Sequence, residues 1–97
     1  MAATITFQAG TTTTVTDFTL TGTVGNVTTI NSSVSGTQFT LSKSSGTVST
    51  DYMSIQDSNA TGGATWNAGT HSVNVSNNTG WIFATAPTLT GQFFAFF

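Results

Sequence analysis

Hydrophobic residues alternate with small polar residues in several short stretches of the chain. The alternating pairs are Ile5 and Phe7, Phe18 and Leu20, Phe39 and Leu41, Val73 and Val75, and Trp81 and Phe83. Side chains two residues apart lie on the same face of a β-strand, so each pair predicts a short strand with one buried face. Clusters of Gly, Ser and Asn separate these stretches about every 10 residues and predict turns. The pattern therefore predicts an all-β chain with no helix of useful length.

An internal repeat refines this prediction. Residues 16–29 (TDFTLTGTVGNVTT) align without a gap with residues 37–50 (TQFTLSKSSGTVST), so that Phe18 corresponds to Phe39. The resulting period of about 21 residues is typical of stacked architectures, in which like residues form ladders. We therefore favour a single β-solenoid or β-helix-like domain over residues 1–97, with one coil per period. The alternative is an antiparallel β-sandwich or jelly roll, because a solenoid usually needs three or more repeats.

The composition excludes several classes of partner. Charged residues make up only 4% of the chain, and there is no Cys. Without a basic patch to contact phosphates, we expect no nucleic-acid partner. No apolar run approaches the roughly 20 residues of a membrane span, and no cationic face could bind a membrane surface, so we expect no membrane partner either. Hydrophobic residues nevertheless reach 37%, which favours a folded chain over a disordered one.

Few residues could carry chemistry. Residues 57–62 (DSNATG) match the first half of a calcium loop, but Ala68 stands where the closing Glu is needed. His71 is the only His, and we interpret it as a hydrogen-bonded structural residue. Asp51 and Asp57 would lie roughly 20 Å apart on an extended strand, which is too far for paired carboxylates and favours turn caps. We therefore expect no enzyme, no metal site and no cofactor.

The large aromatic residues Tyr52, Trp66 and Trp81 have two interpretations. Aromatic faces can stack on sugars, with Asn and Asp supplying hydrogen bonds. The same three residues could instead fill the core, since the chain has few other large side chains. We favour the core.

Residues 45–83 (SGTVSTDYMSIQDSNATGGATWNAGTHSVNVSNNTGWIF) resemble a segment of uncharacterised phage virion proteins and large bacterial surface proteins. The matching residues are Gly46, Val48, Tyr52, Ile55, Gly62, Gly63, Trp66, Ser72, Asn78, Gly80 and Trp81. The resemblance implies a parallel β-helix or similar all-β module in the tail, fibre or head surface of a phage. It carries no catalytic residues over to this chain.

The chain ends in the apolar sequence GQFFAFF. In an extended strand, Phe93 and Phe97 would share one face, and Phe94 and Phe96 the other. A fold can bury one face of a terminal strand in its own core, but burying both faces requires a second surface. Each fully buried Phe contributes about 1.5–3 kcal/mol, so two exposed Phe would favour association. We therefore expect residues 88–97 to form a hydrophobic assembly strand, with a central strand of the same fold as the alternative.

These features together lead us to expect a non-enzymatic structural protein of the phage virion. The preferred role is a head decoration (cement) protein, a homotrimer that stabilises the capsid through contacts with the major capsid protein or another virion protein. A position in the tail or a fibre fits the same residues. The alternative function is a tail- or fibre-associated carbohydrate- or receptor-binding module, in which the Trp and Tyr side chains would be exposed.

Overall fold

The computed structural model describes residues 3–84, and within them the chain is all-β, as expected. None of the described residues forms a helix, so none forms a helix that could cross a membrane. The expected assembly strand, residues 88–97 with its four Phe, lies outside the described residues. The strands are β1 (Ala3–Phe7), β2 (Thr12–Thr14), β3 (Thr28–Ser32), β4 (Phe39–Ser42), β5 (Thr47–Ser49), β6 (Met53–Gln56), β7 (Ser58–Thr61), β8 (Thr65–Gly69), β9 (Val73–Ser76) and β10 (Trp81–Phe83).

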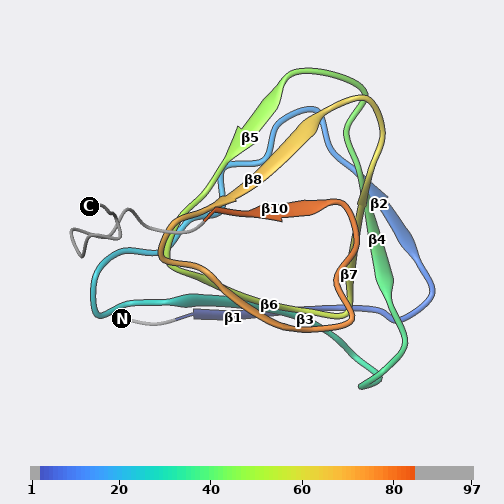
Figure 1. Ribbon diagram of the computed structural model, residues 1–97. Coiled ribbons are helices and arrows are strands. Elements are labelled where there is room, and N and C mark those ends of the chain that lie inside the picture. The colour runs from blue at the N-terminus through green and yellow to red at the C-terminus, as the bar shows by residue number, and fades with distance from the viewer. Residues whose placement is uncertain (1–2, 85–97) are drawn as a thin grey trace, which may run out of the picture.

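The strands form three sheets, which lie along the three sides of a triangle (Figure 1). The first sheet has the order β1-β3-β6-β9, the second β2-β4-β7, and the third β10-β8-β5. The chain visits the sheets in turn, and we call each passage around the triangle a circuit. The second circuit, for example, runs through β3, β4 and β5, and the third through β6, β7 and β8.

All pairings between these ten strands are parallel. The antiparallel sandwich or jelly roll that we kept as the alternative is therefore wrong for residues 3–84. Strands of one circuit instead pair with strands of the next. Two parallel strands need a crossover connection between them, and the remainder of each circuit supplies it.

The register of the pairings differs from the offset of the sequence repeat. Ala3 pairs with Thr28 and Thr28 with Met53, and both of these steps are longer than the step from Phe18 to Phe39. Later circuits are shorter, since Thr47 already pairs with Thr65. Phe18 and Phe39 also occupy different places, because Phe39 opens β4 whereas Phe18 lies in no strand. The repeat therefore reflects similar local strand-and-turn sequences and does not give the pairing register.

The core fills the inside of the triangle. Ile5, Ile30 and Ile55 face one another in consecutive strands of the first sheet. The two later isoleucines are fully buried, and Phe39 and Leu41 of β4 are buried with them in the same core. The outward-facing positions next to the isoleucines carry Thr4, Thr29 and Ser54. This alternation of apolar inside and polar outside is the period-two pattern of the sequence.

Four of the five alternating pairs lie in strands, and the exception is Phe18 with Leu20. Phe18 is nevertheless buried, and its ring packs edge-on against Trp66 and Trp81 at centroid distances of 5.4 and 5.9 Å. The first circuit has no strand in the third sheet, so this aromatic ring fills the core there without a strand to carry it.

Candidate functional site

Two of the three aromatic residues considered for sugar stacking lie inside the molecule. Trp66 in β8 and Trp81 in β10 are paired neighbours and are both buried. Their rings meet edge-to-face, 5.1 Å apart. The indole of Trp66 donates a hydrogen bond to the Thr61 carbonyl oxygen at 3.0 Å, and that of Trp81 donates to Ser58 Oγ at 2.9 Å. With both indole N–H groups paired and both rings packed, neither ring offers a face to a ligand.

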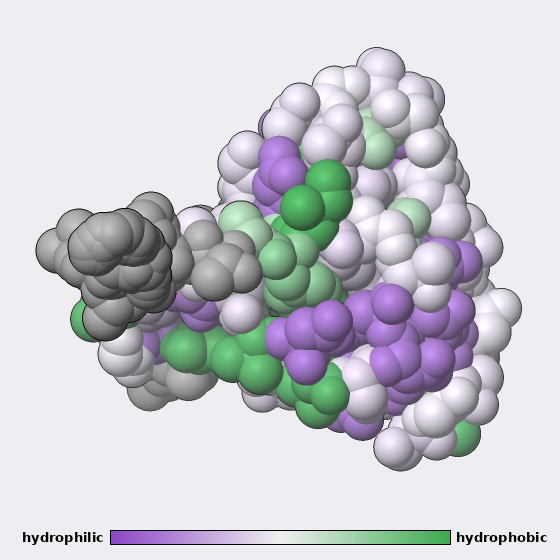
Figure 2. Space-filling view, viewed as in Figure 1, coloured by the Kyte–Doolittle hydropathy of each residue, from purple (hydrophilic) through white to green (hydrophobic). Residues whose placement is uncertain are grey.

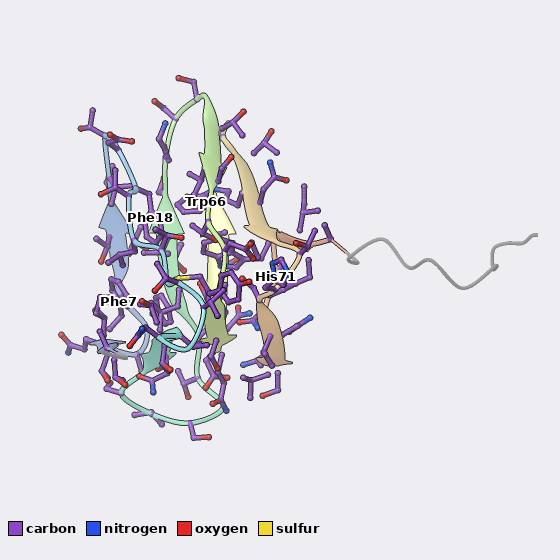
Figure 3. The ribbon with its side chains drawn as sticks, turned by 90° about the vertical axis from the view of Figure 1, so that its left-hand side faces the viewer. Phe7, Phe18, Trp66 and His71 are labelled. Carbon is purple, nitrogen blue, oxygen red and sulfur yellow. The ribbon has the colours of Figure 1, made fainter. Side chains whose placement is uncertain are left out.

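Tyr52 lies at a different place, on the corner between the third and first sheets. Its ring stacks on the imidazole of His71, with centroids 4.5 Å apart and planes 3° from parallel. Tyr52 is half-buried, whereas His71, which is labelled in Figure 3, is exposed. The backbone of Tyr52 has a φ of 52° and therefore turns sharply into β6. Of the three aromatic residues, only Tyr52 reaches a surface.

Asp51 connects this corner to the next circuit through contacts with His71. Its Oδ2 lies 2.8 Å from His71 Nδ1, and its Oδ1 accepts a hydrogen bond from the His71 backbone N–H at 2.8 Å. The Tyr52 N–H donates to the same Oδ1 at 3.0 Å. Partial burial would raise the pKa of Asp51, but the hydrogen bonds from His71 and Tyr52 and the attraction to His71 outweigh it, so the pKa lies below its usual value.

This Asp51–Tyr52–His71 corner has one element of an acid–base site, a carboxylate that orients an imidazole. Among residues 3–84, however, His71 Nε2 has no hydrogen-bonded nucleophile, and no cavity is present to hold a substrate. The same residues contain no cluster of three or more His, Cys, Asp or Glu that could bind a metal ion. What the corner visibly does is connect consecutive circuits: Asp51 bonds to His71 of the next circuit, and Thr21 Oγ1 of an earlier circuit accepts from the Asp51 N–H at 3.1 Å.

Asp57 lies at the opposite end of β6 from Asp51, so the two carboxylates are separated by the whole strand. Its side chain is only 1% exposed. Oδ2 accepts a hydrogen bond from the Gly36 N–H at 3.0 Å, and Oδ1 accepts one from Asn77 Nδ2 at 2.8 Å. The carboxylate thereby joins three loops of three circuits.

The DSNATG stretch that resembles half of a calcium loop is not a loop. Ser58–Thr61 form strand β7, which pairs with β4, and Ser58 and Ala60 point into the core. Asn59 and Thr61 share the outward face of this strand, but two residues of extended chain hold them about 6.6 Å apart, so they do not curl around one ion as a calcium loop does. Asp57 remains outside the strand, where it accepts the hydrogen bonds from Gly36 and Asn77 described above.

The last circuit departs from the inside–outside pattern of the others. In β9, Asn74 continues the inward column of Ile5, Ile30 and Ile55, and Val73 continues the outward column of Thr4, Thr29 and Ser54. In β10, Ile82 follows Asn67 on the outward side of the third sheet. The side chains of Val73, Val75 and Ile82 are 55%, 47% and 50% exposed. The last circuit thus carries apolar side chains at the outward positions of Val73 and Ile82, and all four residues of β9, including Asn74, are exposed.

The exposed side chains of Val73, Val75 and Ile82 form the apolar part of one end of the molecule, which we call the β9–β10 end. Figure 2 looks onto this end and shows hydrophobic surface over β10 and along β9, beside a hydrophilic area. The sequence pattern correctly predicted a strand here, Val73–Ser76. It did not reveal that Val73 lies beside Ser54 in the outward column or that the register shifts at Val75, because both depend on the pairing with β6.

Comparison with known proteins adds no relative: no family model, no curated protein and no solved structure matches this chain.

Proposed function

We propose that this chain is a non-enzymatic structural subunit of a bacteriophage particle, which acts by assembling with copies of itself and with another virion protein. The preferred role is a head decoration protein that stabilises the capsid through buried contacts, with the major capsid protein as partner and a homotrimer as the assembled form. The phage assignment is supported by the resemblance of residues 45–83 to virion and surface proteins.

The observation that carries the assembly proposal is the exposed apolar surface of the last circuit. Val73, Val75 and Ile82 are about half exposed, whereas the outward positions that precede Val73 and Ile82 in their sheets carry Thr4, Thr29, Ser54 and Asn67. Burying a Val or Ile side chain fully contributes about 1.5–3 kcal/mol, so this end gains free energy when something covers it. Residues 3–84 also carry only four charged residues, Asp17, Lys43, Asp51 and Asp57, so little charge must be desolvated in a contact.

We further propose that the fold is a β-solenoid, in which the circuits described above are its coils. Three parallel sheets visited in turn by successive circuits support this interpretation. The coil length would vary along the chain, in place of the uniform length expected from the repeat. A solenoid leaves strand edges at both ends, and such edges are natural sites for stacking or capping.

The solution mass tests the assembly proposal. We expect the full chain to be a defined oligomer in light scattering, and a chain that stops after Gly91 to be monomeric or unfolded because it lacks all four Phe of the C-terminus. A stable monomer of the full chain would contradict the proposal. Mass alone does not identify the virion partner, so binding of the purified oligomer to capsids is the second measurement.

One observation favours a second function, a carbohydrate- or receptor-binding module of a tail or fibre. The stacked rings of Tyr52 and His71 lie at the surface, and aromatic faces of this kind can pack against sugars. Titration of glycans against the chemical shifts of His71 would test this function. If glycans shift His71 and a Tyr52→Ala variant does not bind them, the binding module replaces the structural subunit as the preferred function.

A further inference from the structure

We infer that the β9–β10 end is the surface that receives the C-terminal segment, residues 88–97, of a neighbouring copy of this chain. The inference rests on the proposed function, because it names which surface makes the contact between subunits. Three features support it: the free edge of β9, the apolar residues beside that edge, and the composition of the segment.

β9 has a free edge in the part of the chain that the structure describes. It pairs with β6 on one side and with no described strand on the other. The neighbouring edge of β7 is different, because Thr79 covers it: Ala60 N–H donates to the Thr79 carbonyl at 2.8 Å, and Thr79 N–H donates to that of Ser58 at 2.9 Å. Strand β9 therefore offers backbone groups to an added strand at this end.

Nothing in β9 discourages such pairing. Edge strands of proteins that stay monomeric usually carry a charged residue or a Pro that blocks a further strand. The sequence of β9, Val-Asn-Val-Ser, has neither. Its two Val residues instead favour an extended partner, since β-branched side chains pack well in cross-strand pairs.

The opposite end of the molecule lacks this combination. There, β1 is the edge strand, and its outward residues next to β3 are Thr4 and Thr6. Its inward residues Ile5 and Phe7 are half-buried, and the Phe7 ring stacks on Phe39 at 4.5 Å. The usual inside–outside pattern holds at this end, so the exposed apolar side chains carried by strands are a feature of the β9–β10 end.

Residues 88–97 (TLTGQFFAFF) have the composition of a strand that would fit this end. They carry no charged side chain and contain five large apolar residues, Leu89 and four Phe. Ten residues span about 33 Å when extended, which is longer than a short strand such as β9. The segment could therefore pair along β9 and still place Phe side chains against Ile82 of β10.

A C-terminal segment exchanged between copies would bury more of the Phe side chains than a segment folded onto its own domain. Phe93 and Phe97 would face one side of an extended segment, and Phe94 and Phe96 the other. A segment laid on its own domain buries one of these faces and leaves the other in water. A segment held between two copies buries both, at the β9–β10 end of the recipient and against the donor.

Disulfide cross-linking tests the inference, and the chain suits the method because it has no natural Cys. One preparation carries Val73→Cys, and the others carry Phe93→Cys or Phe94→Cys, since neighbouring positions allow for either register. After mixing, refolding together and mild oxidation, we expect a covalent pair between Val73→Cys chains and at least one of the Phe variants. Thr4→Cys is the matched control, because Thr4 faces outward from the same sheet at the other end.

The outcomes separate this inference from the proposed function. A cross-link that forms only within single chains of the Val73→Cys/Phe94→Cys double variant would overturn the inference, because the segment would then cap its own domain. Equal cross-linking to Thr4→Cys, or none with Val73→Cys in a chain that remains oligomeric, would also overturn it while leaving the structural-subunit proposal standing. A monomeric full chain would contradict both.

Discussion

The contact between Asp51 and His71 joins two consecutive circuits through one carboxylate. Asp51 accepts hydrogen bonds from the His71 N–H and the Tyr52 N–H, and its Oδ2 lies 2.8 Å from His71 Nδ1. These contacts favour the ionised carboxylate and lower the pKa of Asp51 from its usual 3.8 despite partial burial. A carboxylate with a lowered pKa links folding to pH, because the unfolded chain binds its proton more readily.

We expect this link to appear as acid sensitivity. Since the folded-state pKa is the lower one, the stabilisation by Asp51 is complete above the usual value of 3.8 and is lost as the pH falls through the folded-state value. Thermal unfolding followed from neutral to acid pH should therefore show a smaller acid-induced decrease in the Asp51→Asn variant than in the natural chain.

Thr21→Val is the matched control for this experiment. Thr21 Oγ1 hydrogen-bonds to the backbone of Asp51 and does not touch its carboxylate. This variant should be less stable at every pH and keep the natural pH dependence. An Asp51→Asn curve parallel to the natural one would show that the carboxylate contacts do not contribute to folding.

The sequence predicted which residues face inward but not which residues contact each other between circuits. The first depends on neighbours in the sequence, whereas the second depends on residues far apart in the sequence. Alternation alone indicated that Ile5, Phe39 and Leu41 face inward, because that requires only the local period of a strand. The contact of Asp51 with His71 depends on which residues of consecutive circuits the register brings together. No local pattern fixes that register when the circuits differ in length.

At the scale of elements, the corners decide how closely circuits stack. Gly62 follows β7 with a φ of +92°, and a Cβ there would lie 2.1 Å from the Lys43 carbonyl oxygen of the preceding circuit. Gly36 has almost the same φ, +90°, but nothing lies within 4 Å of its Cβ position. The two glycines therefore differ in packing and share the same backbone requirement.

Comparison of Gly36→Ala with Gly62→Ala separates the cost of backbone strain from the cost of close packing at a corner. We expect Gly36→Ala to cost about 1–2 kcal/mol of unfolding free energy, because an L-residue is strained at positive φ. Gly62→Ala should cost roughly 1–3 kcal/mol more, because its methyl group must also displace the backbone of the neighbouring corner. Denaturant unfolding measures both, and equal losses would show that the corners tolerate a wider separation of circuits.

Strand positions were more predictable than strand partners. The period-two pairs located β1, β4, β9 and β10, since alternation and turn residues are local signals. The sequence repeat misled because residues 18–21 form no strand whereas the aligned residues Phe39–Ser42 form β4, so Phe18 and Phe39 align in sequence but not in structure. The step from one strand to its partner also shortens along the chain, from Thr28–Met53 to Thr47–Thr65, which leaves no single period to detect.

At the scale of the whole molecule, the free edge of β9 is the place where the proposed assembly would change the pairing of a strand. Strand β3 is paired on both sides, by β1 and β6, whereas β9 is paired only with β6 in residues 3–84. Amide hydrogens on an unpaired edge exchange rapidly with water, and those within a sheet exchange slowly. If a neighbouring copy supplies the missing strand, the protection of β9 must depend on assembly.

Hydrogen–deuterium exchange of the full chain and of the chain stopped after Gly91 measures this dependence. We expect the amides of Val73–Ser76 that point away from β6 to be protected in the full chain and to exchange rapidly in the shorter one, with β3 protected in any preparation that remains folded. Dilution should also remove the protection of β9, because a contact between copies weakens with dilution whereas a contact within one chain does not. Protection of β9 that survives dilution would place the covering strand in the same chain, and rapid exchange in the full oligomer would place the subunit contact elsewhere.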